Sequence, residues 1–168
     1  MRIFLIGFMG CGKSTFGRKL ATQMGYDFID LDQLFESMAG TSIAEYFKAN
    51  GEEAFRQEES RILKSYDYPT NCVVATGGGA PCYFDNMDWI NNNGLSVYIQ
   101  MSPTALAQRL EKGKAKRPLL KGLNNAEIID FIEHKLAERA NYYERALITI
   151  NGIDISIEQL RARLFEIS

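Results

Sequence analysis

The stretch that decides the fold is residues 7–15, which read GFMGCGKST and fit the pattern G-x-x-x-x-G-K-[ST]. The apolar run of residues 3–6, IFLI, comes directly before it and predicts a buried strand. A strand, a glycine-rich loop and a helix in this order point backbone N–H groups and the positive helix end at one spot, which forms a cradle for polyphosphate. In this pattern Lys13 adds a charge for the β- and γ-phosphates, and Ser14 adds a hydroxyl for Mg²⁺. The stretch therefore predicts a P-loop.

Composition predicts one domain without a nucleic-acid or membrane partner. The chain has 168 residues with 46% hydrophobic content, enough for a single well-buried domain over residues 1–168. The net charge of −2 gives no positive field that would attract nucleic acid or an anionic membrane. No apolar run approaches the ~20 residues that cross a bilayer, and three cysteines without metal or disulfide spacing predict reduced thiols. We expect a cytoplasmic protein.

Segments of strand length alternate with helical patterns along the whole chain. This alternation predicts an α/β fold with a parallel sheet, in which the carboxyl ends of the strands face the ligand crevice. The predicted strands are residues 3–6, 26–29, 72–75, 96–99 and 147–150, and the predicted helices are residues 16–24, 31–38, 42–49, 52–66, 86–92, 126–143 and 157–165, with a further helix that begins at Ser102-Pro103.

Two carboxylates follow the second predicted strand. Asp30 and Asp32 are two residues apart, so both side chains can lean toward the same side of the strand end. Because strand ends of this sheet type face the crevice, we expect both carboxylates at the phosphate site. The alternative is that Asp30 caps the helix of residues 31–38 and Asp32 is solvated in its first turn.

The predicted helix of residues 52–66 carries a polar face. Arg56 and Glu59 are three residues apart and can pair across one helical turn, which would hold the guanidinium in one orientation. Periodicity alone predicts that this face is a solvated array of salt bridges.

Three glycines end the third strand, in the segment TGGGAP of residues 76–81. Glycine loses more conformational entropy on folding than other residues, so the run makes sense where backbone must approach a ligand or another loop closely. An ordinary flexible turn is the alternative.

Residues 112–118, KGKAKRP, are basic and have no apolar period. This segment is typical of a mobile loop that closes over a nucleotide and brings a guanidinium to the transferring phosphate. A solvated charge run is the alternative.

The ordered set of motifs resembles the shikimate kinase family over nearly the whole chain. The resemblance implies a three-layer αβα fold with a five-stranded parallel sheet, similar to nucleoside monophosphate kinases, with a mobile lid at about residues 112–125 and substrate-binding helices at about residues 31–66. It implies transfer of the γ-phosphoryl of ATP to the 3-hydroxyl of shikimate, a step toward chorismate and the aromatic amino acids. The motifs are residues 7–15, FIDLD at 28–32, Phe55-Arg56, TGGG at 76–79, RPLL at 117–120, and Arg139 before Tyr142-Tyr143.

The resemblance also implies a role for each motif residue, in a monomer whose partners are ATP and shikimate. Lys13, Asp32 and Arg117 would be catalytic, with Asp32 taking the proton of the 3-hydroxyl. Ser14 and Asp30 would hold Mg²⁺. ATP would be bound by Gly10, Cys11, Gly12, Lys13, Ser14, Thr15, Arg109 and Arg117, and shikimate by Asp32, Arg56, Gly78, Gly79 and Arg139. The loop NGIDI of residues 151–155 departs from the family's adenine-contacting loop because it is more apolar.

Two other functions remain open on the residues alone. Another small-metabolite kinase of the same build, such as a gluconate kinase, would also place paired arginines and Asp32 around a hydroxylated carboxylate. A P-loop regulator that switches on nucleotide state would share residues 7–14. It would not need Arg56, Arg139 and the glycine turn to face one pocket.

Overall fold

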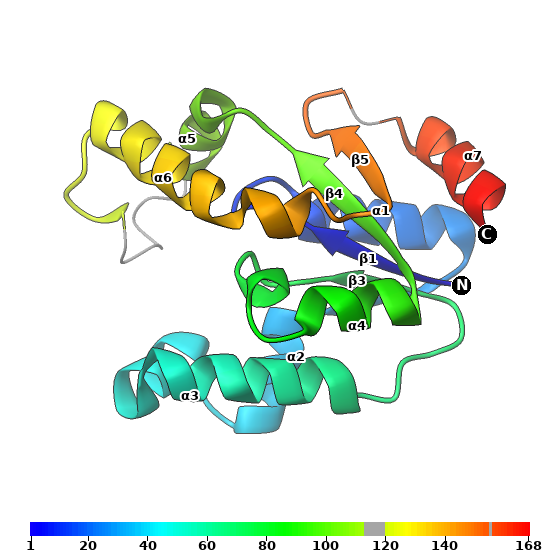
Figure 1. The fold of residues 1–168 in the computed structure, drawn as a ribbon, viewed down its shortest axis with the longest axis horizontal. Coiled ribbons are helices and arrows are strands. Elements are labelled where there is room, and N and C mark those ends of the chain that lie inside the picture. Colours follow the sequence, from blue (N-terminus) through cyan, green and yellow to red (C-terminus); the bar gives the residue numbers. More distant parts are fainter. Residues whose placement is uncertain (113–119, 155) are drawn as a thin grey trace.

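Strands and helices alternate in the computed structural model, which describes residues 1–112, 120–154 and 156–168 (Figure 1). The strands are β1 (Arg2–Ile6), β2 (Asp27–Asp30), β3 (Cys72–Ala75), β4 (Leu95–Gln100) and β5 (Ile148–Asn151). The helices are α1 (Lys13–Met24), α2 (Leu31–Ala39), α3 (Ile43–Ser65), the short 3-10 turn η1 (Ala80–Cys82), α4 (Asn86–Asn93), α5 (Pro103–Glu111), α6 (Asn125–Tyr143) and α7 (Ile157–Ile167).

The five strands form one sheet in the order β2-β3-β1-β4-β5, and every neighbouring pair is parallel. The predicted five-stranded parallel sheet is therefore confirmed. After β1 the chain forms β2 at the edge of the sheet, and β3 then takes the place between β2 and β1. The chain next adds β4 and β5 on the other side of β1. Ligands bind beyond the carboxyl ends of strands at such a change of direction.

The central strand β1 is buried on both faces, which makes the fold three-layered. Ile3 and Leu5 belong to an apolar cluster with residues of α1, α5, α6 and α7. Phe4 and Ile6 point the other way and belong to a cluster with residues of α3 and α4. This alternation follows from the two-residue period of a strand. Figure 1 shows α3 and α4 on one side of the sheet and α1 and α7 on the other.

Local signals set the helix ends close to where the sequence predicts them. Ser102 caps α5 by accepting a hydrogen bond from the amide of Ala105, and Pro103 fills the first helical position. The predicted helices of residues 42–49 and 52–66 run together as α3, but Gly51 breaks the helix with φ 84° and ψ 173°. The last helix reaches Ile167, two residues beyond its predicted end.

Among the described residues, no helix is both long enough and apolar enough to cross a membrane.

A buried asparagine ties the layers together near the glycine turn. Asn86, at the start of α4, is fully buried. Its Oδ1 accepts a hydrogen bond from Ser60 Oγ of α3 at 2.6 Å. Its Nδ2 donates to the carbonyl of Ala80 in η1 at 2.8 Å. A buried polar group needs such partners.

We expect Asn86→Ala to lower the free energy of unfolding by about 1–3 kcal/mol, because the Ser60 hydroxyl and the Ala80 carbonyl lose their partner inside the protein. Urea denaturation measures the change. The matched control is Asn92→Ala, which alters an exposed asparagine of the same helix and should cost less than about 0.5 kcal/mol. Equal effects of the two substitutions would contradict the role of Asn86.

Candidate active site

The P-loop has the geometry that its sequence predicts. Gly12 precedes α1 with φ 96°, a left-handed conformation that favours glycine. The buried Lys13 folds back over the loop, and its Nζ donates hydrogen bonds to the carbonyls of Gly7 at 2.7 Å and Phe8 at 3.0 Å. The loop is thus shaped around its own ammonium group. Phosphate oxygens can take the place of these carbonyls as partners of the Lys13 charge.

Asp30 caps α2, as one alternative predicts, and also lies beside the P-loop residue Ser14, which is the position that the other alternative predicts. Its Oδ1 caps α2 by accepting hydrogen bonds from the amides of Asp32 at 3.0 Å and Gln33 at 3.3 Å. Its Oδ2 accepts a hydrogen bond from Ser14 Oγ at 2.6 Å. A hydroxyl and a carboxylate side by side at a phosphate cradle suit Mg²⁺, which typically takes one or two protein oxygens plus phosphate oxygens. The donor set therefore fits the metal that the sequence predicts.

Asp32 lies in the first turn of α2, where the residue as a whole is exposed although many protein atoms surround its carboxyl group. The surrounding protein removes water from the carboxyl and raises the pKa of Asp32 above its usual range, and the negative charge of Asp30 adds to this. Lys13 and Arg56 act in the opposite direction. A carboxyl with a raised pKa is better matched to accepting a proton than an ordinary aspartate.

Arg56 and Glu59 form the predicted ion pair, but the prediction of a wholly solvated face is wrong. Arg56 Nη1 donates to Glu59 Oε1 at 2.9 Å, and only 14% and 8% of the two side chains are exposed. The pair that stays at the solvent is Arg61 with Glu58. Periodicity identifies the polar face of a helix, and in α3 the part of this face that carries Arg56 and Glu59 lines a cavity.

The Arg56 guanidinium is held by aromatic rings and keeps unused donors. Its Cζ lies 4.3 Å from the ring centroid of Tyr83 and 5.0 Å from that of Phe55. Its Nε is buried and makes no hydrogen bond among the described residues. Burial raises the pKa of the Glu59 carboxyl, and the Arg56 charge opposes that rise. An oriented guanidinium with free N–H groups suits a bidentate carboxylate ligand.

Charged side chains and backbone approach the three glycines closely, which confirms the predicted close approach. A Cβ on Gly77 would lie 2.9 Å from Asp32 Oδ1. A Cβ on Gly79 would lie 2.6 Å from Arg56 Nη2. At Gly78 the nearest atoms would be the amide nitrogen of Met9 at 3.2 Å and Arg139 Nη1 at 3.4 Å.

Arg139 reaches the same turn from α6. Its Cζ lies 5.4 Å from the ring centroid of Phe8. Its Nη1 donates to the hydroxyl of Tyr143 at 3.4 Å, and that hydroxyl donates to the carbonyl of Gly78 at 2.5 Å. Tyr143 is not among the predicted site residues, although its position four residues after Arg139 on one helix predicts that the two side chains are neighbours.

Two cavities meet at Asp32, and we call them the phosphate cavity and the acceptor cavity. The phosphate cavity, about 500 Å³, includes the P-loop residues Gly10 and Gly12 to Thr15 with Asp30. The acceptor cavity, about 520 Å³, includes Arg56, Glu59, Gly79 and Arg139. Met9, Asp32 and Gly78 line both. The two predicted halves of the site are therefore adjacent.

The lining of the acceptor cavity carries equal numbers of opposite formal charges, with Asp32, Glu52 and Glu59 against Arg56, Lys135 and Arg139. Glu59 and Glu52 lie beside Arg56, 2.9 Å from its Nη1 and 4.0 Å from its Nε. Asp32 also lines the phosphate cavity, whereas none of the three cations does. This lining fits a molecule that carries a hydroxyl for Asp32 and an anionic group for Arg56 and Arg139.

Arg109 lies against the outer side of the P-loop. Its Nη1 donates to the carbonyl of Cys11 at 3.1 Å, and its Nη2 to that of Gly152 at 3.5 Å. A cavity of about 340 Å³ lies here between Arg109, Thr15 and the loop after β5. The Cys11 side chain is 1% exposed and belongs to the apolar core, so it fills space inside the loop.

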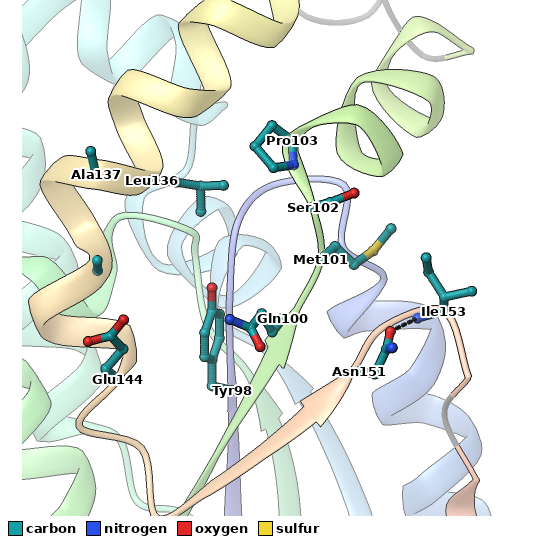
Figure 2. Close-up of a pocket in the computed structure, with 11 residues that line it drawn as sticks. Tyr98, Gln100, Met101, Ser102, Pro103, Leu136, Ala137, Glu144, Asn151 and Ile153 are labelled. Atoms are coloured by element: carbon teal, nitrogen blue, oxygen red, sulfur yellow. Dashed lines mark hydrogen bonds between the residues drawn. The ribbon is translucent and has the colours of Figure 1, made fainter.

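A larger cavity, about 590 Å³, lies between α6 and the ends of β4 and β5 (Figure 2). Figure 2 shows Tyr98, Gln100 and Glu144 at this cavity. Glu144 is its one charged lining residue among the described residues. Without a cation this cavity is a poor phosphate site, so size alone does not identify the active site.

The predicted lid residue Arg117 lies outside the described residues, as do residues 113–119 in general. Leu120, which follows them, is fully buried in the core cluster that includes Ile128 and Ile132 of α6.

Comparison with known proteins agrees with this geometry. The family model described as shikimate kinase matches residues 9–166. The shikimate kinase of Parabacteroides distasonis is 43% identical over 151 residues, covering 90% of this chain and 87% of that protein. The shikimate kinase of Bacteroides fragilis is 39% identical over 172 aligned residues, covering 98% of this chain and 96% of that protein.

Solved structures give the same result. The crystal structure of shikimate kinase from Bacteroides thetaiotaomicron has a TM-score of 0.88 and 37% identity, and covers 99% of this chain and 97% of that one. The shikimate kinase from Acinetobacter baumannii in complex with shikimate has a TM-score of 0.80 and 31% identity, and covers 99% of this chain and 91% of that one. The chain therefore belongs to the shikimate kinase family.

Proposed function

We propose that this protein is an ATP-dependent shikimate kinase, which transfers the γ-phosphoryl of ATP to the 3-hydroxyl of shikimate in aromatic amino acid biosynthesis. The observation that carries the proposal is the position of Asp32, where a P-loop cavity meets a cavity lined by Arg56 and Arg139. In such a reaction the protein contributes mostly positioning and electrostatic stabilisation.

The P-loop residues from Gly10 to Thr15 bind the phosphates of ATP. Lys13 exchanges its two carbonyl partners for β- and γ-phosphate oxygens. Ser14 and Asp30 would hold Mg²⁺, which would neutralise the charge of the ATP phosphates. Arg109 lies along the adenine, next to Gly152.

The acceptor is held at both ends. Arg56 and Arg139 bind the shikimate carboxylate, and the backbone of Gly78 and Gly79 contacts the substrate. This leaves the 3-hydroxyl at Asp32, which accepts its proton as the new bond to phosphorus forms. Arg117 stabilises the charge that develops on the transferring phosphoryl group.

We further propose a cytoplasmic monomer of 19.0 kDa with bound Mg²⁺. The net charge of −2 supports small-molecule partners rather than nucleic acid or an anionic membrane.

We expect shikimate to be the preferred acceptor in an assay of ADP release with Mg-ATP across shikimate, quinate, gluconate and nucleoside monophosphates. The acceptor cavity is lined by Asp32, which also lines the phosphate cavity, and by Arg56 and Arg139, and this lining suits a hydroxylated carboxylate. Faster turnover with gluconate or a nucleotide at equal concentration would refute the assignment.

Arg139→Ala and Arg117→Ala should have opposite kinetic signatures. A carboxylate contact acts in both ground and transition states, so Arg139→Ala should raise KM for shikimate at least tenfold. Arg117→Ala should mainly lower kcat, by on the order of 10³ or more. Steady-state kinetics of both variants separate the roles. A kcat within about threefold of the parent for Arg117→Ala, roughly 0.65 kcal/mol of barrier, would mean that residues 112–118 form a solvated charge run.

The acidic limb of the pH profile should belong to Asp32. The active form is deprotonated, so kcat/KM falls as pH drops through the pKa of Asp32, and this raised pKa places the fall at a higher pH than for an ordinary aspartate. Asp32→Asn should lower kcat about 100-fold or more and remove that limb from the residual activity. An unchanged limb in Asp32→Asn would assign the titration to another group.

A further inference from the structure

Tyr143 is a fully buried residue at the end of α6, and its hydroxyl makes two contacts within the acceptor site. It donates a hydrogen bond to the carbonyl of Gly78 at 2.5 Å. It accepts one from Nη1 of Arg139 at 3.4 Å. One hydroxyl thus connects the glycine turn after β3 to the arginine of α6, although Gly78 and Tyr143 are 65 residues apart in the chain.

The bond to the Gly78 carbonyl also sets the direction of the next amide. A trans peptide is planar, so the carbonyl of Gly78 and the N–H of Gly79 point in opposite directions. Fixing that carbonyl toward Tyr143 turns the Gly79 N–H away from Tyr143. The amide of Gly79 donates no hydrogen bond to any described residue, and Gly79 lines the acceptor cavity. It is a free donor whose direction depends on the Tyr143 hydroxyl.

Packing alone does not require that hydroxyl. The Tyr143 ring stacks on the ring of Tyr98 with centroids 5.1 Å apart, and it lies in the apolar cluster with Ile6 and Tyr98. Phenylalanine has the same ring and would fill this space without a polar atom to bury. A hydroxyl in such a place costs free energy unless it is hydrogen-bonded. Both of its partners, Arg139 and Gly78, line the acceptor cavity.

Tyr98 supports the Tyr143 ring. The planes of the two rings are 33° apart, and Tyr98 also lines the large cavity of Figure 2. The contact with Tyr98 and the surrounding apolar cluster hold the Tyr143 ring, which leaves its hydroxyl in a fixed position relative to Arg139 and Gly78.

We propose that Tyr143 is a positioning residue for the acceptor, whose hydroxyl orients the Arg139 guanidinium and the Gly78–Gly79 peptide before the substrate binds. This inference rests on the proposed function, in which Arg139 and Gly79 contact shikimate. It assigns to Tyr143 a contribution to acceptor affinity, made through other groups.

The test compares Tyr143→Phe with Tyr68→Phe. Tyr68 is a matched control because it is also buried and its hydroxyl also donates to a backbone carbonyl, that of Leu63 at 2.9 Å, away from both cavities. Both substitutions remove one oxygen and its hydrogen bond to a backbone carbonyl, and Tyr143→Phe also removes the long contact with Arg139, so their effects on thermal stability should be similar. Kinetics give KM for shikimate and for ATP, and calorimetry gives the Kd of shikimate.

We expect Tyr143→Phe to raise KM and Kd for shikimate about fivefold or more, the loss expected from one hydrogen bond of ~1 kcal/mol. KM for ATP should stay within twofold, and Tyr68→Phe should leave all three constants within twofold of the parent. Because the apparent Kd is the intrinsic Kd divided by the fraction of binding-competent protein, thermal denaturation first establishes that each variant is fully folded at the assay temperature.

If Tyr143→Phe binds shikimate as the parent and Tyr68→Phe do, the positioning role is refuted. An equal rise in the constants for both variants would refute it too, because the effect would then be structural. Absence of shikimate phosphorylation in the parent protein would instead refute the proposed function.

Discussion

The site depends on the parallel pairing of β1 with β3. Leu5 lies opposite Ala75 in this register, and the amide and the hydroxyl of Thr76 both donate to the carbonyl of Leu5 at 3.1 Å. The two strands therefore end together, and the P-loop and the glycine turn leave the sheet side by side. Gly78 would meet the amide nitrogen of Met9 at 3.2 Å if it carried a Cβ. A shift of this register would separate the phosphate cavity from the glycines of the acceptor cavity.

Close packing where the two cavities meet also explains the raised pKa values of its carboxyl groups. Asp32 and Glu59 both have raised pKa values, first because protein surrounds them and then because each lies near another carboxylate. Arg56 opposes the rise at both residues. Charges held this close in a partly dehydrated cleft interact more strongly than at the surface. Their positions are set by folding, so little reorganisation is needed when charge moves during phosphoryl transfer.

Local signals in the sequence predict most of the fold and much of the site. The strand of residues 72–75 and the Ser102 cap come directly from residue patterns, and the parallel sheet follows from the alternation of strands and helices. The inward position of Glu59 does not follow, because helical periodicity separates polar from apolar faces but does not tell solvent from a cavity lined by other elements. The contact of Tyr143 with Gly78 could not be predicted for a related reason, since it joins α6 to a turn 65 residues away.

Asp30 shows that one carboxylate can cap a helix and contact the P-loop at the same time. Its two carboxylate oxygens are divided, with Oδ1 on the amides of α2 and Oδ2 on Ser14. The cap uses only Oδ1, so Oδ2 can change its partner without loss of the cap. Asp32 lies in the first turn of α2, which this cap holds, and lines both cavities. One carboxylate therefore links Ser14 of the P-loop to the position of Asp32.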